Sequence, residues 1–230
     1  MGIKVKTIVV VSLLLVIIGI ITAYSIPQIQ IIRQKHDYSY HWVYIYSRFR
    51  NISWAVLDTS RLVNMMVINR GDTDKLPHIM HDVFDINRTI RFYIDDITLS
   101  IRYDPNLHTR DMIFYTNRIN ELDNQIQQYM FELVSPIYQI ALNDFDNKPL
   151  IFEMLQLEIE LYNIIHETLN ELIISTTDRM IDLHEDISLF TNHTTGIILL
   201  WGIIGMTIGV LMIMHIGIIK NKLTSNNMKQ

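Results

Sequence analysis

Hydrophobic positions recur at alternating steps of three and four along most of this chain. The longest such series runs from residue 152 to residue 190, and ten of its twelve positions are apolar or aromatic. Its members are Phe152, Leu155, Ile159, Tyr162, His166, Leu169, Ile173, Thr176, Met180, Leu183, Ile187 and Phe190. A period near 3.5 residues keeps one seam of a helix against its partner helices, as in a coiled coil. The pattern therefore predicts a long helix packed in a bundle.

Three earlier segments carry the same spacing, each with one apolar seam. The four predicted helices span about residues 28–69, 75–103, 109–142 and 148–194. Gly71 is placed for a left-handed turn that ends the first helix, and Asp74 for a cap that begins the second. Pro136 predicts a kink inside the third helix. Four such helices joined by short connections predict an all-α fold, an up-down-up-down antiparallel four-helix bundle.

The first and third predicted helices also have long seams. The seam of the first helix comprises Ile31, Lys35, Tyr38, Trp42, Ile45, Phe49, Ile52, Val56, Thr59, Val63 and Met66. The seam of the third helix comprises Met112, Tyr115, Ile119, Leu122, Ile126, Tyr129, Leu133, Pro136 and Ile140. Each list is a prediction of which side chains face the bundle core.

Two stretches are hydrophobic on all sides and flank the bundle. The first, at residues 7–26, contains no charged residue, and the second, at residues 196–219, contains only His215 as an ionisable residue. A bilayer core of roughly 30 Å needs about 20 apolar residues in a helix, so both stretches are predicted transmembrane helices. A cleaved signal peptide is the alternative for the first. Its apolar core is long for a signal peptide and its cleavage site is poor, so we expect an uncleaved anchor.

The charges are distributed unevenly along the chain. All 24 acidic residues lie between Asp37 and Asp186, whereas the terminal segments 1–6 and 220–230 carry only bases. Short basic flanks stay on the cytoplasmic side, so both termini are predicted cytoplasmic and residues 27–195 extracytoplasmic. The chain is thus expected to cross the cell membrane twice, with the lipid bilayer as a partner. The middle segment has a net charge of −10, which disfavours nucleic acid.

The composition narrows the possible functions. The chain has no cysteine, which excludes disulfides, thiolate metal sites and cysteine nucleophiles. No nucleophile–base arrangement, phosphate-binding loop or cofactor fingerprint occurs in the sequence. We therefore expect neither an enzyme nor a bound cofactor.

One group of residues has the types and spacing of a metal site. His78 and His81 share a helix face at the start of the second predicted helix, beside Asp82. The alternative is an ordinary solvated helix start, where acidic residues favour the N-terminus. A metal-carrying bundle would normally use Glu-x-x-His pairs, and the chain has none.

A second group is a candidate ligand site. Arg48 and Arg50 lie on the first predicted helix among tyrosines that fall outside its apolar seam. Arginines together with exposed aromatic residues are typical of binding surfaces. His166 interrupts the seam of the last helix, where it could act as a protonation switch or as a hydrogen-bonded layer that fixes register. The alternative for the arginines and tyrosines is core and interface packing.

The second span contains a small-residue motif. Gly205 and Gly209 are separated by four positions, which allows two helices to approach closely in lipid. We take them as candidate contacts of a transmembrane dimer.

The layout as a whole resembles a known family. A basic N-terminus, an uncleaved span, a four-helix bundle and a returning span are similar to the periplasmic sensor module of bacterial methyl-accepting chemotaxis receptors and sensor kinases. The resemblance implies a homodimer in which a ligand or partner shifts the last helix along the membrane normal. It lies in the architecture, so it assigns no ligand residues.

The chain departs from that family after the second span. Only residues 220–230 follow, with no linker or output domain, so we expect a separate membrane or cytoplasmic signalling partner. A receptor remnant and an accessory subunit remain possible readings of this layout. The competing function is a structural or assembly subunit of a membrane complex, with the bundle as a docking post.

Overall fold

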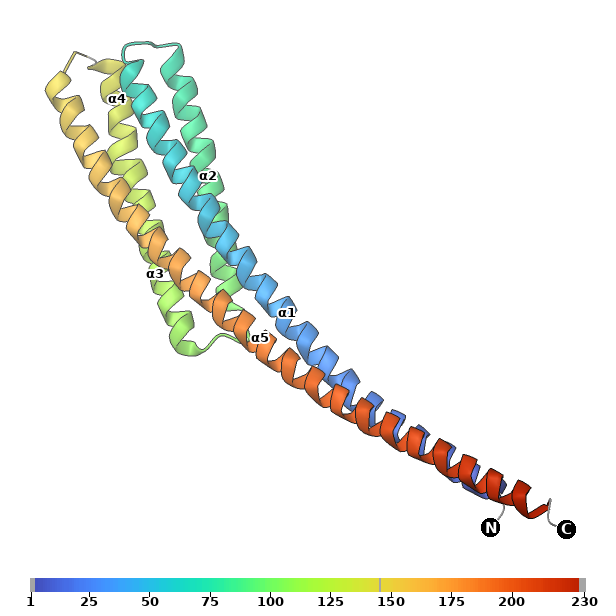
Figure 1. The fold of residues 1–230 in the computed structure, drawn as a ribbon. Helices are drawn as coiled ribbons and strands as arrows, with labels where there is room; N and C mark the ends of the chain where they lie inside the picture. Colours follow the sequence, from blue (N-terminus) through green and yellow to red (C-terminus); the bar gives the residue numbers. More distant parts are fainter. Residues whose placement is uncertain (1–2, 145, 228–230) are drawn as a thin grey trace. The chain divides into compact units, whose positions relative to one another are not determined.

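The computed structural model describes residues 3–144 and 146–227. Over these residues the protein is all-helical, with 93% helix and no strand, which confirms the all-α part of the predicted fold. The elements are α1 (Ile3–Ile68), α2 (Lys75–Arg102), α3 (Thr109–Gln128), the π-helical turn η1 (Tyr129–Val134), α4 (Ser135–Asn143) and α5 (Lys148–Asn227) (Figure 1). Because α3, η1 and α4 follow one another without a break, the described chain forms four long helical segments.

The chain divides into two compact units. One comprises Met1–Ser39 and Asp182–Gln230, and we call it the paired-helix unit. The other comprises Tyr40–Ile181, and we call it the four-helix unit. Helices α1 and α5 contribute to both units, whereas α2, α3, η1 and α4 belong to the four-helix unit alone.

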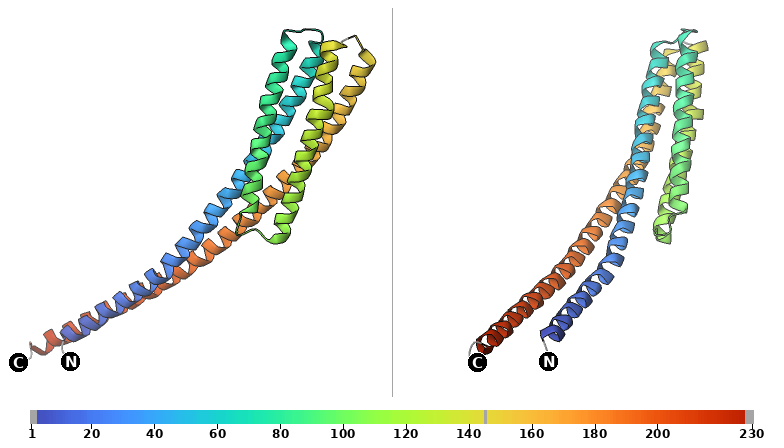
Figure 2. Two further views of the ribbon diagram at one scale, coloured as in Figure 1. Left: turned by 180° about the vertical axis from the view of Figure 1, so that it is seen from behind. Right: turned by 90° about the vertical axis from the view of Figure 1, so that its right-hand side faces the viewer.

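The four-helix unit is organised around an apolar core. Its segments of α1, α2, α3–α4 and α5 lie side by side, and α2 packs against both α3 and α4 (Figures 1 and 2). The seam predicted for the first helix is buried without exception from Trp42 to Met66. The buried members of that seam are Trp42, Ile45, Phe49, Ile52, Val56, Thr59, Val63 and Met66. A regular α-helix with apolar residues at this spacing keeps one face in the core, as α1 does here.

The π turn changes which residues of the third segment face the core. Buried positions follow the predicted seam through Tyr129 and Leu133, but beyond η1 they are Ile137 and Ala141 in place of Pro136 and Ile140. A π turn closes its hydrogen bonds over five residues, so it takes up one residue more than an α turn. The predicted seam is therefore wrong by one position after η1. Pro136 itself is the second residue of α4, directly after the π turn.

The predicted seam of the last helix is also wrong by one position in its first half. Ile151, Glu158 and Ile165 are buried, whereas Phe152 and Ile159 are exposed. From Leu169 onward the buried residues include Leu169, Thr176 and Ile187 of the predicted seam, together with Leu172, which that seam omits. The core face of α5 thus carries a glutamate where apolar spacing alone favours its neighbour.

The connection between α1 and α2 is held by a glycine and an aspartate. Gly71 has a φ of 79°, the left-handed conformation that its position predicts, and its N–H donates to the Ala141 carbonyl at 2.8 Å. Asp74 occupies the N-cap position of α2, as predicted, but its side chain makes no capping hydrogen bond, and Asp72 accepts one instead. The Asp72 Oδ1 accepts the backbone N–H of Lys75 at 3.0 Å, and this bond lowers the pKa of Asp72.

The paired-helix unit contains the two apolar helices. Both α1 and α5 are long and apolar enough to span a membrane, and their apolar stretches are not buried inside the described chain. The two helices lie side by side (Figure 2), and Lys35 forms an ion pair with Asp186. The hydroxyls of Thr22 and Ser25 donate to carbonyls one turn earlier, which satisfies them without water.

Gly205 and Gly209 contact the chain's own first helix. A methyl group added to Gly205 would lie 3.3 Å from Cγ2 of Ile17, and one added to Gly209 would lie 3.9 Å from Cδ2 of Leu14. The close approach that the glycine spacing predicts thus occurs between α5 and α1 of one chain. A transmembrane dimer contact at Gly205 and Gly209 stays a prediction.

Candidate functional site

A buried polar pair joins η1 to α5 inside the four-helix unit. The hydroxyl of Tyr129 donates to Oε1 of Glu158 at 2.5 Å, and each residue is only 2% exposed. A carboxylate removed from water is costly unless it receives hydrogen bonds, so this donor is needed for Glu158 to occupy the core. The π turn presents Tyr129 at the core face opposite Glu158.

Burial and the neighbouring carboxylate perturb Tyr129. Desolvation raises the pKa of Tyr129 far above its ordinary value, and the charge of Glu158 raises it further. A phenolate beside a buried carboxylate would be strongly disfavoured. Tyr129 therefore stays a neutral hydrogen-bond donor across the whole physiological range.

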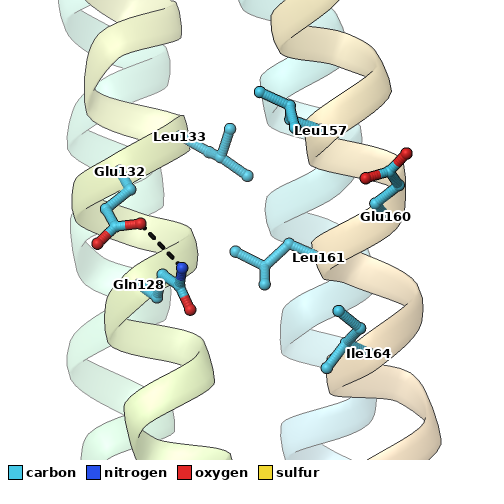
Figure 3. Close-up of a pocket in the computed structure, with 7 residues that line it drawn as sticks. All are labelled: Gln128, Glu132, Leu133, Leu157, Glu160, Leu161 and Ile164. Atoms are coloured by element: carbon cyan, nitrogen blue, oxygen red, sulfur yellow. Dashed lines mark hydrogen bonds between the residues drawn. The ribbon is translucent and has the colours of Figure 1, made fainter.

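A groove runs between the two helices next to this pair. Its volume is about 220 Å³, and it is formed by three residues at the end of α3 and in η1 and by four residues of α5 (Figure 3). The lining residues are Gln128, Glu132, Leu133, Leu157, Glu160, Leu161 and Ile164. Leu133, Leu157 and Leu161 point toward the space between the helices, and Glu132 and Glu160 lie to either side (Figure 3).

The carboxylates around this groove lack a basic partner. Gln128 donates to Glu132 at 2.9 Å, but none of the ion pairs between described residues includes Glu132, Glu158 or Glu160. The groove is also lined by no lysine, arginine or histidine. An apolar wall and an uncompensated negative rim thus occur at one place. We call the groove, together with the Tyr129–Glu158 pair, the Glu158 site.

No protein-family model, curated protein or solved structure matches this chain. Its function is therefore inferred from its own residues. The Glu158 site is the place where a cavity, buried charge and irregular helix geometry coincide, and π turns inside α-helices are frequent at functional sites.

The predicted arginine site has a different character. Arg48 pairs with Asp96 at 3.0 Å, and its guanidinium lies 4.6 Å from the Tyr44 ring and 4.8 Å from the Tyr93 ring. The Arg48 charge is thus paired with Asp96, and its planar face lies against tyrosine rings of the same chain. The hydrogen bond to Tyr44 raises the pKa of Arg48. Arg50 is exposed, two positions along the helix. The structure does not bring the two arginines together with His166 in one lined cavity.

His166 does not occupy the core. It is exposed, and its ring stacks on Tyr162 with the centroids 6.0 Å apart. The one-position shift of the α5 seam explains this, because the core face passes through Ile165 instead. The predictions of a buried protonation switch and of a register-fixing layer at His166 are wrong.

The predicted metal residues are dispersed over a solvated surface. His78, His81 and Asp82 are all exposed, and His81 lies 3.6 Å from Asp85 one turn away. In the described parts of the chain, no three histidine, aspartate or glutamate residues are grouped so that they could hold a metal ion. The three predicted ligands therefore do not form a metal-binding group in the described structure.

Sequence reasoning missed Glu158 because a seam is read from apolar residues. The signal that could have found it is the pair Ile151 and Ile165, which flank Glu158 at steps of seven. A charged residue between two apolar positions of one heptad register indicates a buried polar group that needs a partner. The tyrosine that provides this partner lies 29 residues earlier in the chain.

Proposed function

We propose that this protein is a membrane-anchored signal-input module. In this proposal the four-helix unit is an antiparallel bundle outside the cell, and α1 and α5 each continue as a transmembrane helix, with both termini in the cytoplasm. A ligand or partner bound to the bundle shifts α5 along its axis. The second span transmits that shift to a separate signalling partner, and the module acts as a homodimer.

The observation that carries this proposal is the continuity of α5. It is one helix from Lys148 to Asn227, and it contributes core residues such as Ile165 to the four-helix unit and the apolar span to the paired-helix unit. An uninterrupted helix is stiff along its axis, so a displacement at one end is transmitted to the other. The resemblance to chemoreceptor sensor modules adds the expectation of a piston-like motion.

The Glu158 site supplies a place where such a shift could be controlled. It joins α5 to η1, and a π turn is a strained alternative to the regular α-helix at that point. Two arrangements of α5 against η1 that differ by a few kcal/mol would form the bistable element that signalling needs.

Cysteine cross-linking in the paired-helix unit tests this proposal. The chain has no native cysteine, so pairs can be introduced directly. Leu14 with Gly209 is the matched pair, because a side chain at Gly209 would contact Leu14. Leu14 with Met212 is the displaced pair, one turn further along α5. A signalling module should form both cross-links, with proportions that change when the four-helix unit is perturbed by Glu158→Gln.

The competing function gives a different cross-linking result. A structural or assembly subunit has no need for two registers of α5 against α1. Cross-linking of Leu14 with Gly209 alone, at the same rate in the wild-type background and with Glu158→Gln, would contradict the signal-input proposal and favour a scaffold.

A further inference from the structure

We propose that the groove of the Glu158 site binds a small organic cation with a short aliphatic body, of the class of primary alkylamines. The role of this cation as an input rests on the proposed function, but its binding does not. Three properties of the groove carry the inference, namely its apolar wall, its uncompensated negative charge and its size.

The wall favours a hydrocarbon body. Leu133, Leu157, Leu161 and Ile164 line the groove from two facing helices, and Leu157 and Ile164 are 43% and 46% exposed in the empty groove. Covering this surface is favourable by about 25 cal/mol for each Å² of apolar area removed from water. An aliphatic chain lying between η1 and α5 would cover it.

The rim favours a positive head group. Glu132 and Glu160 are exposed and line the groove from opposite helices, whereas Glu158 is buried and does not line it. The Glu132 and Glu160 carboxylates have no basic partner among the described residues, so they give a negative potential at the mouth of the groove. Both rim side chains are long and solvent-exposed, so they can turn toward a bound ammonium group. An anion or a second acidic surface would be repelled.

The size restricts the ligand. A volume of about 220 Å³ is below the range of roughly 300–1,000 Å³ that holds drug-sized molecules. The groove therefore suits one short chain with a single head group, and it excludes bulky aromatic cations and polypeptide helices. Because the ligand would contact both η1 and α5, its binding would favour one of their two arrangements.

Isothermal titration calorimetry of the full chain in uncharged lipid nanodiscs tests the inference. The probes are n-pentylamine, n-pentanol and pentanoate, which share a body and differ in the charge of the head. We expect saturable binding of n-pentylamine, weaker binding of n-pentanol and none of pentanoate. Equal binding of amine and alcohol would overturn the charge argument.

Two variants place the binding at the groove. Glu132→Gln with Glu160→Gln should weaken n-pentylamine binding by about tenfold or more, because it removes both rim charges. Glu167→Gln is the matched control, an exposed glutamate of α5 that does not line the groove, and it should leave binding unchanged. A loss equal in both variants, or in neither, would overturn the site. Circular dichroism checks that each variant remains folded.

The cross-linking assay separates this inference from the proposed function. If n-pentylamine binds as expected but leaves the proportion of the two cross-links unchanged, the site stands and its role as an input fails. If both cross-links form but no amine binds, the signal-input proposal stands and the ligand class is wrong.

Discussion

Glu158 shows how a single residue can determine which face of a helix enters a core. The α5 sequence offers two adjacent faces at this level, one through Ile159 and one through Glu158, and the second is the buried one. The Tyr129 hydroxyl makes that choice possible, since it provides a charge-assisted hydrogen bond inside the core. The pair therefore fixes the rotation of α5 relative to η1.

Removing the Tyr129 hydroxyl should destabilise the protein, because the buried Glu158 then loses its hydrogen-bond donor. Tyr129→Phe leaves a buried carboxylate without its hydrogen bond, which costs about 1–3 kcal/mol in the free energy of unfolding. The effect should be much smaller in a Glu158→Leu background, where no carboxylate remains to be satisfied. Urea unfolding of the four variants measures this coupling. Strictly additive losses would show that the two side chains do not interact.

The same pair predicts a change in stability at alkaline pH. The pKa of Tyr129 is raised in the folded state, whereas an unfolded tyrosine titrates near pH 10, as a rough reference value. The unfolded chain therefore releases this proton first, and the stability from Tyr129 is complete below about pH 10 and lost as the pH rises further. The stability advantage of the wild type over Tyr129→Phe should shrink as the pH rises above about 10. A constant difference would contradict the assignment.

At the scale of the element, the π turn is the feature that apolar spacing could not predict. The sequence correctly predicts a helix on both sides of η1, because both sides carry seam residues at helical spacing. It cannot predict the extra residue, since the choice between an α turn and a π turn depends on packing against α5 and α2. Pro136 indicated an irregularity near this point, but the irregularity precedes the proline.

Deleting one exposed residue tests whether η1 holds an inserted position. Phe131 lies in the π turn and is 66% exposed, so its deletion should restore a regular α turn and keep Ile137 and Ala141 in the core. Deletion of the exposed Asn124, in regular helix, is the matched control and should rotate one side of the helix by roughly 100°. We expect cooperative thermal unfolding to survive the first deletion and not the second. The reverse order would be inconsistent with a π turn.

The two membrane-type helices provide a second test at this scale. Gly205→Leu would place a side chain against Ile17, so it should separate α1 from α5 and lower the thermal unfolding midpoint in nanodiscs. Gly202→Leu is the control, because its added Cβ would have no neighbour within 4 Å. Equal effects of the two substitutions would place the close helix contact elsewhere.

At the scale of the whole molecule, the sequence predicted the all-α class and the two apolar helices because both depend on periodicity and hydropathy. It misplaced the groups that depend on tertiary packing. His166 was expected in the core and is exposed, and the buried Glu158 was not identified from the sequence. The glycine spacing predicted a close helix approach without identifying the partner helix, and Gly205 lies close to Ile17 of the same chain.

Cysteine labelling in intact cells tests whether the chain crosses the membrane twice with the four-helix unit outside. Arg110→Cys lies in α3 of the four-helix unit, and Ser225→Cys lies beyond the second span near the end of α5. A membrane-impermeant maleimide should label residue 110 in intact cells and residue 225 only after the membrane is permeabilised. Protection of residue 110 in intact cells, with labelling of residue 225, would contradict the account.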